Sequence, residues 1–156
     1  MINVDFMPSG PIARYTMRLF VTRTLAVLVS LVLILMTLDL LGESGKILAV
    51  PGNGQAQLGH YVVLRLPLLI SRFLPFSALL GTLIAFAGLN QHSEVVAMKA
   101  AGISAHQILA PLILASAILG LVTFVFNETV VVHSARAVNA WSDADYHAVP
   151  AESDIL

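Results

Sequence analysis

Charged residues are scarce in this chain, and their scarcity defines its class. Only 11% of the residues are Asp, Glu, Lys or Arg, against about 25% in an ordinary soluble domain. Hydrophobic residues make up 58% of the sequence, and the mean hydropathy is +0.88. Water is therefore not the main solvent of the folded chain, and we expect an all-α membrane protein.

Cysteine is absent, which excludes disulfides and thiolate metal sites without identifying a compartment. The net charge of -1 excludes binding to nucleic acid by phosphate neutralisation. The five histidines are scattered and show no His-Glu-x-x-His spacing. We therefore expect no enzyme, no catalytic residue, no metal site and no cofactor.

The segment Gly42–Lys46 resembles part of a phosphate-binding P-loop. The full pattern requires Gly at position 40 and Ser or Thr at position 47, where this chain has Leu40 and Ile47. We therefore expect no ATP binding through this motif.

Two long runs without charge lie on either side of one polar hairpin. No charged residue occurs between Arg72 and Glu94, and none between Lys99 and Glu128. A membrane-spanning helix needs about 20 mostly apolar residues, so each run is long enough. A third apolar run, Leu19 to Leu41, lies earlier in the chain. The predicted spans are 14–41, 62–90 and 104–127.

The first run could instead be a signal peptide, with Arg14, Arg18 and Arg23 as its basic region. No small-x-small cleavage signal follows the apolar core, because the sequence continues Asp39-Leu40-Leu41-Gly42-Glu43. A retained first helix is the better interpretation.

Orientation follows from the distribution of basic residues. Three arginines precede the first span, and this predicts a cytoplasmic N-terminus. The turn residues Pro51-Gly52-Asn53-Gly54 indicate a loop, and we expect all of Gly42–Tyr61 to be an external loop. The polar hairpin is then cytoplasmic, and the acidic segment after Asn127 is external.

Small residues predict where helices approach each other. Ser77, Gly81 and Ala85 recur every four residues in the second span, with Gly88 about one further turn on, and Ser116 and Gly120 repeat this spacing in the third. Such patterns allow close helix packing in lipid.

The polar hairpin Asn90–Ser104 encodes a short helix, a stop and a second helix start. Ser93 is a suitable N-cap residue, and Glu94 behind it is favoured by the helix dipole. Gly102 is a suitable C-terminal stop, and Ser104 with Gln107 matches a capping box. These residues predict a short helix at 93–101. By itself this pattern favours a simple amphipathic interfacial turn with a solvated Glu94.

Two segments of the chain resemble the LptF/LptG permeases. They are Leu74-Pro75-Phe76-Ser77-Ala78-Leu79-Leu80-Gly81 and Ser93-Glu94-Val95-Val96-Ala97-Met98-Lys99-Ala100-Ala101-Gly102. The resemblance extends from about Arg14 to about Tyr146, and the sequence Asp39-Leu40-Leu41 is more similar to LptG than to LptF. These permeases form the membrane part of the ABC transporter that extracts lipopolysaccharide from the inner membrane.

The resemblance implies that the hairpin is a coupling helix, which docks in a groove of the cytoplasmic ATPase LptB. Glu94 would pair with a basic residue of that ATPase. The rest of the docking surface would be formed by Ser93, Val95, Met98 and Gly102. ATP hydrolysis would take place in LptB, so this subunit would be non-catalytic.

The resemblance also implies contacts with the lipid substrate. Family members carry basic residues near the outer end of the first helix, where this chain has Asp39, Glu43 and Lys46, so that Lys46 is the one basic residue there. Arg72, about two turns deeper than Arg65, needs a partner or a wet cavity, and the resemblance suggests an anionic headgroup. The expected lipid-binding residues are Asp39, Lys46, Arg72 and Arg136.

The family has six spans, with a periplasmic β-jellyroll between the third and the fourth. We therefore expect an N-terminal half: a transmembrane domain at 1–127 and an irregular periplasmic extension at 128–156, which stops before the jellyroll. The expected partners are LptB, the paralogous permease (LptF or LptG), the periplasmic bridge components LptC and LptA, and lipopolysaccharide. The expected location is the bacterial inner membrane.

Two other functions remain open from the sequence. The chain could be a permease of another ABC transporter, or a non-transport membrane scaffold that docks a soluble partner through the 93–101 hairpin. The ATPase that co-purifies would distinguish the first case, and a lipid-dependent ATPase activity of the partner would exclude the second.

Overall fold

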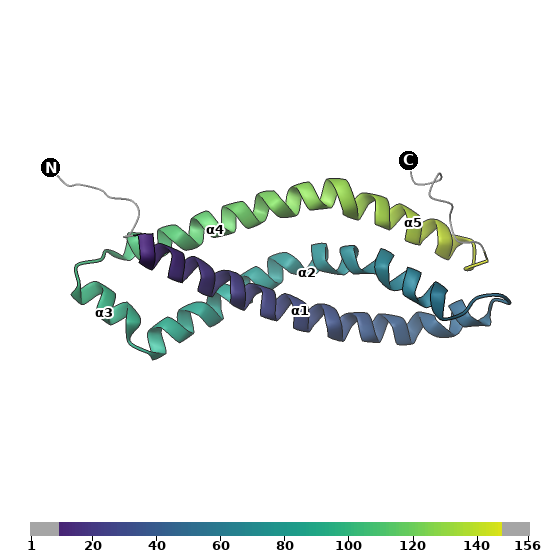
Figure 1. Cartoon of the computed structure of the whole chain (residues 1–156), viewed down its shortest axis with the longest axis horizontal. Helices are drawn as coiled ribbons and strands as arrows, with labels where there is room; N and C mark the ends of the chain where they lie inside the picture. Colours follow the sequence, from purple (N-terminus) through teal and green to yellow (C-terminus); the bar gives the residue numbers. More distant parts are fainter. Residues whose placement is uncertain (1–9, 148–156) are drawn as a thin grey trace. The chain divides into compact units, whose positions relative to one another are not determined.

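A computed structural model describes residues 10–147, and in this part of the chain all regular structure is helical. Three long helices make up most of this part of the chain: α1 (Gly10–Ala49), α2 (Gln55–Gln91) and α4 (Ala105–Phe126). A short helix, α3 (Glu94–Ala100), lies between α2 and α4 (Figure 1). After α4 the helix continues as the π-helical segment η1 (Asn127–Val131) and as α5 (Val132–Asp143).

Within residues 10–147, three helical stretches are long and apolar enough to cross a membrane: Gly10–Ala49, Gln55–Gln91 and Ala105–Asp143. The predicted all-α fold with three spans and a short intervening helix is confirmed. α1 has 40 residues, far more than the apolar region of about 7–15 residues in a signal peptide.

The chain divides into two compact units. The described part of unit 1 comprises residues 10–28 and 75–122, and that of unit 2 comprises residues 29–74 and 123–147. Unit 1 therefore contains the start of α1, the second half of α2, all of α3 and most of α4.

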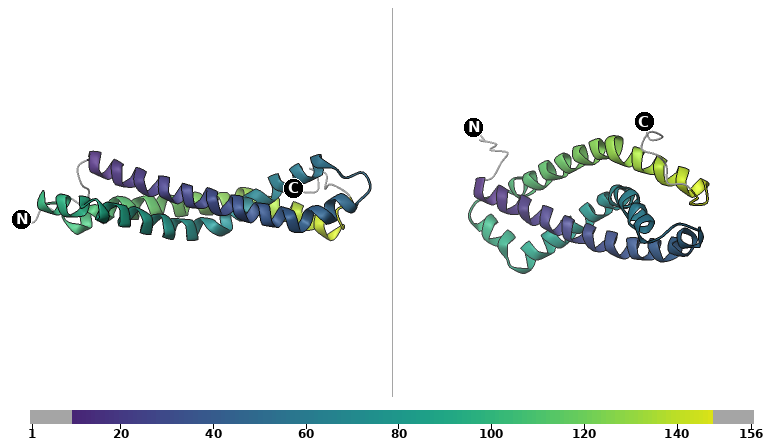
Figure 2. Two further views of the ribbon diagram at one scale, coloured as in Figure 1. Left: turned by 90° about the horizontal axis from the view of Figure 1, so that it is seen from below. Right: turned by 45° about the vertical axis from the view of Figure 1, so that its right-hand side comes forward.

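The predicted external loop Gly42–Tyr61 is wrong in its extent. α1 continues to Ala49 and α2 begins at Gln55, so only a short turn separates them (Figure 2). The turn occurs at Gly52, whose φ of 98° is a conformation that glycine adopts without strain. Helix continues through Gly42 and Gly45 because the fully buried Ile47 anchors this end and Glu43 is held by a hydrogen bond from Tyr146.

The predicted irregular segment after Asn127 is also wrong within the described residues. α5 is amphipathic, and it buries Ala137, Val138 and Trp141. These positions lie one and four residues apart, which places them on one helix face. The described acidic residues of this segment, Glu128, Asp143 and Asp145, are all exposed. The predictions for residues 148–156 lie outside the described part.

Unit 1 has an apolar core where α1, α2 and α4 meet. Phe20, Leu112 and Ala115 are buried there, and Ala78 and Phe86 pack against them. Gly81 allows the closest approach, since a Cβ atom added to it would lie 2.7 Å from the backbone Cα of Thr24. Ser77 and Ala85 are also buried. The small-residue prediction is therefore confirmed for Ser77, Gly81 and Ala85 of α2.

The same prediction is wrong for Gly120 of α4. A Cβ atom added to Gly120 would meet nothing within 4 Å, and the residue is exposed. Gly88 of α2 is similarly open to a side chain.

Candidate functional site

Helix α3 is a single short element with well-defined ends. At its C-terminal end, the N–H of Gly102 donates to the carbonyl of Lys99 and that of Ile103 to Met98, each over 3.0 Å. This is the Schellman arrangement, and Gly102 provides the required positive φ, 84°. The predicted helix stop at Gly102 is confirmed.

The start of α4 is capped as predicted. The N–H of Ser104 donates to Oε1 of Gln107 over 3.0 Å, and the N–H of Gln107 donates to Oγ of Ser104 over 3.4 Å. The start of α3 differs from the prediction. Ser93 occupies the N-cap position, but its φ of 55° is left-handed and its side chain makes no capping hydrogen bond. A capping side chain normally requires an extended N-cap backbone.

The faces of α3 differ in exposure. Val96 is 63% exposed, and Ser93, Ala97 and Ala100 are exposed beside it. Glu94, Val95 and Met98 are only half exposed because they turn towards the other helices of unit 1. Of the five predicted docking residues, therefore, the structure turns three towards the chain itself. Val96, the one large apolar residue of α3 that is exposed, was not among the predicted docking residues.

Glu94 has a partner in α1. The hydroxyl of Tyr15 donates to Oε1 of Glu94 over 3.1 Å. Both residues line a pocket of about 350 Å³ between α1 and α3, together with Pro11, Ile12, Ala97 and Met98. The Glu94 carboxylate is thus held by Tyr15, and it also remains accessible because the pocket that it lines is open.

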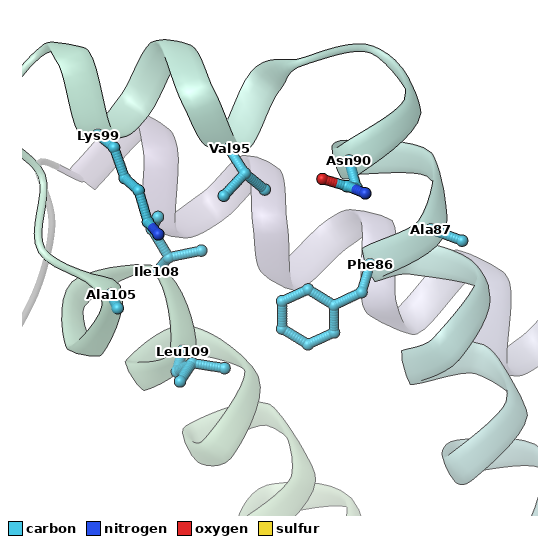
Figure 3. Close-up of a pocket in the computed structure, with 8 residues that line it drawn as sticks. All are labelled: Phe86, Ala87, Asn90, Val95, Lys99, Ala105, Ile108 and Leu109. Atoms are coloured by element: carbon cyan, nitrogen blue, oxygen red, sulfur yellow. The ribbon is translucent and has the colours of Figure 1, made fainter.

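A second pocket lies on another side of α3 (Figure 3). It has a volume of about 470 Å³, and Val95 and Lys99 of α3 line it with the end of α2 and the start of α4. The structure therefore places Val95 against this pocket and not on the exposed face with Val96.

In unit 2, Asp39 of α1 forms an ion pair with Arg65 of α2. Nε and Nη2 of Arg65 donate to the two carboxylate oxygens, each over 3.0 Å, and the Tyr61 hydroxyl donates to Oδ2 over 2.7 Å. The side chains of Arg65 and Asp39 are 30% and 21% exposed. Asp39 was predicted as a lipid contact, but here its negative charge is compensated within the chain.

A second cluster of polar side chains lies nearer the α1–α2 turn. Lys46 pairs with Glu43 over 3.0 Å, and the Tyr146 hydroxyl donates to the other oxygen of Glu43 over 2.9 Å. Tyr146 follows α5, and burial raises the pKa of its phenol. Asn53 joins the two segments, because its amide donates to the carbonyls of Ile47 and Tyr146.

The side chain of Trp141 in α5 is fully buried next to this polar cluster. His60 and Tyr146 contact it edge-on, with ring centroids 5.7 Å and 5.3 Å away. These contacts hold α5 against the α1–α2 turn of unit 2. No role for Trp141 was predicted from the sequence.

The four predicted lipid-binding residues do not form one site. Lys46 is paired with Glu43 and Asp39 with Arg65. Arg72 and Arg136 are exposed, and no ion pair within residues 10–147 involves either of them. Arg72 therefore has no charged partner among the described residues, and its contact with an anionic headgroup stays a prediction.

The segment Gly42–Lys46 lies within helix α1. A P-loop requires an irregular, glycine-rich turn whose N–H groups surround the phosphates, so this segment has the wrong conformation for one.

Comparison with known proteins identifies relatives. The family model of the lipopolysaccharide export system permease LptF/LptG matches residues 14–153. The lipopolysaccharide export system permease protein LptG of Escherichia coli strain K12 is 33% identical over 127 residues, which are 79% of this chain and 34% of that protein. The LptG protein of Escherichia coli O6:H1 strain CFT073 matches with the same identity and coverage.

The chain spans about a third of the length of these curated relatives. No solved structure matches the chain. The family match covers most of the sequence and includes α3 and the helices on both sides of it. The chain belongs to the LptF/LptG family of lipopolysaccharide export system permeases.

Proposed function

We propose that this chain is the N-terminal transmembrane part of a permease subunit that extracts lipopolysaccharide from the bacterial inner membrane. In this proposal α3 is the coupling helix, and the N-terminus and the α3 hairpin are cytoplasmic. The ATPase LptB supplies the energy, a paralogous permease completes the membrane part, and LptC and LptA accept the lipid. Family membership supports this assignment.

The observation that carries the proposal is the construction of α3. A short helix, closed at its C-terminal end by Gly102 and followed by a capped α4, is held between two apolar helices. It presents Val96 outward and keeps the Glu94 carboxylate at an open pocket. An exposed apolar residue beside a carboxylate suits a protein groove that carries a basic residue.

Reversing the apolar character of Val96 tests the docking surface. In the full-length protein, Val96→Asp should abolish co-purification with LptB, because a carboxylate would be buried without a partner. Pro51→Asp is the matched control, since Pro51 is exposed at the α1–α2 turn. Equal recovery of LptB with both variants would contradict docking through α3.

The identity and activity of the co-purifying protein distinguish the proposed function from the two alternatives. Recovery of a different ATPase would indicate another ABC transporter. Recovery of LptB whose hydrolysis does not respond to lipopolysaccharide would indicate a scaffold.

A further inference from the structure

The pocket between α2, α3 and α4 combines an apolar surface with a positive one. Its volume of about 470 Å³ lies within the range of about 300–1,000 Å³ typical of ligand sites. The residues that line it are Phe86, Ala87, Asn90, Val95, Lys99, Ala105, Ile108 and Leu109 (Figure 3).

The apolar part of the pocket comes from the ends of the two uncharged runs. The ring of Phe86 faces the open space, with Ile108 and Leu109 across from it on α4 (Figure 3). Leu109 is 41% exposed. These residues lie where α2 and α4 meet the polar hairpin, so this part of the pocket opens at the boundary between hydrocarbon and headgroups if the helices cross a membrane.

The positive part comes from Lys99 and from the start of α4. The ammonium group of Lys99 points towards Ile108, across the pocket from α3 (Figure 3). Neither of the two ion pairs within residues 10–147 involves Lys99. Ala105, the first residue of α4, lines the same pocket, and the start of a helix is the positive end of its dipole.

Lys99 lies in the last turn of α3, and an anion between its ammonium group and the start of α4 would interact favourably with both positive charges. The amide of Asn90, on the α2 side of the pocket, adds a hydrogen-bond donor. An occupant with an anionic group near Lys99 and an apolar chain against Phe86 and Leu109 would complement both parts.

We propose that this pocket binds an anionic phospholipid from the leaflet on the hairpin side of the membrane. Its phosphate lies between Lys99 and the start of α4, and one acyl chain runs along Phe86 and Leu109. The site uses a different face of α3 from the exposed Val96. It requires only that the helices cross a membrane, and not the transport function proposed above.

Photoreactive lipids test the site directly. The full-length protein is reconstituted in vesicles of phosphatidylethanolamine and phosphatidylglycerol that contain either photoreactive phosphatidylglycerol or photoreactive phosphatidylcholine with the same acyl chains. Crosslinked peptides are then identified by mass spectrometry. We expect phosphatidylglycerol to label the peptides that contain Phe86 and Leu109, and phosphatidylcholine to label them about fivefold less, the ratio typical of one cation near an anionic leaflet.

Substitutions distinguish the contribution of the Lys99 charge to lipid labelling from that of the pocket's shape. Lys99→Gln should reduce phosphatidylglycerol labelling about fivefold, and Lys99→Arg should preserve it. Lys46→Gln removes a lysine of unit 2 and should have no effect. Ala105→Phe fills the pocket and should reduce labelling by both lipids, whereas Ala100→Phe, on α3 outside the pocket lining, should not.

Three results would overturn the proposal. The first is equal labelling by the two lipids, and the second is unchanged labelling in Lys99→Gln. The third is loss of labelling when the ATPase subunit is added, because the pocket would then belong to the contact with that protein.

Discussion

Tyr15 of α1 donates a hydrogen bond from its hydroxyl to Oε1 of Glu94, the first residue of α3, over 3.1 Å. The bond connects the N-terminal part of the first apolar helix to the proposed coupling helix. The bond uses one carboxylate oxygen of Glu94, and no other group within residues 10–147 donates a hydrogen bond to Oε2. Tyr15 therefore orients Glu94 while leaving an oxygen for a partner's cation.

Tyr15→Phe should weaken binding of LptB about threefold to tenfold, the effect of losing one hydrogen bond that positions a carboxylate. The ring remains, so the pocket with Pro11 and Met98 keeps its shape. Affinity measured with the reconstituted full-length permease checks the prediction. In the Glu94→Gln background, Tyr15→Phe should have little further effect, because the two residues act as a pair. Unchanged or tighter binding in Tyr15→Phe alone would contradict the positioning role.

The Asp39–Arg65 pair should stabilise the α1–α2 hairpin of unit 2. Asp39→Asn or Arg65→Gln should each lower the free energy of unfolding by about 1–2 kcal/mol. This value is below the 3–5 kcal/mol of a fully buried pair because both side chains are partly exposed. Thermal unfolding of the purified full-length protein in detergent measures the change.

A double-mutant cycle isolates the pair from other effects of the two substitutions. The double variant Asp39→Asn with Arg65→Gln should lose less than the sum of the single losses. Strict additivity would show that the two residues contribute independently, and that Asp39 remains available to an external ligand.

Gly81→Ala should separate α1 from α2 in unit 1. The new Cβ atom would lie 2.7 Å from Cα of Thr24, which belongs to the backbone and cannot rotate away. We expect a loss of about 1–3 kcal/mol in the free energy of unfolding, the usual cost of overpacking. Gly88→Ala, on the same helix and with open space around its Cβ atom, is the control and should change stability little. Equal effects of the two substitutions would exclude close packing as the reason for Gly81.

The three arginines in the first turns of α1 predict a cytoplasmic N-terminus and a cytoplasmic α3 hairpin. Cysteines introduced at Ser93 and at Pro51, both exposed, should react with a membrane-impermeant thiol reagent from opposite sides. Ser93→Cys should react only from the cytoplasmic side, and Pro51→Cys only from the periplasmic side. The chain has no native cysteine to interfere. Labelling of both positions from one side would overturn the arrangement.

The sequence predicted the features that depend on local chemistry. Uncharged runs located the long helices, and Gly102 with the Ser104–Gln107 pair located the ends of the hairpin helices. The length of the first loop was not predicted, because Gly42, Glu43 and Gly45 favour a turn locally. Burial of Ile47 and the contacts of Tyr146 with Glu43 and Asn53 override that preference.

The partners of the site residues depend on tertiary contacts and were also missed. Tyr15 and Glu94 are far apart in the chain, and nothing in the hairpin itself indicates α1 as its neighbour. The Asp39–Arg65 pair could in principle have been predicted from the sequence. Both residues lie at equal distances along the chain from Gly52, so an antiparallel helical hairpin that turns there brings them to the same depth. A correct loop length was needed to see this register.

Charge exchange at Glu94 tests the central claim most directly. The full-length permease is reconstituted with its paralogue and with LptB in proteoliposomes, and release of lipopolysaccharide is measured per ATP hydrolysed. We expect Glu94→Arg to abolish release, with a loss of about 2–5 kcal/mol in assembly because a basic residue of the ATPase groove remains unpaired. Reversing the charge of that basic residue should restore release, and Glu94→Gln should not be rescued by it. Normal release with Glu94→Arg would contradict the account and return Glu94 to the role of a solvated helix-end residue.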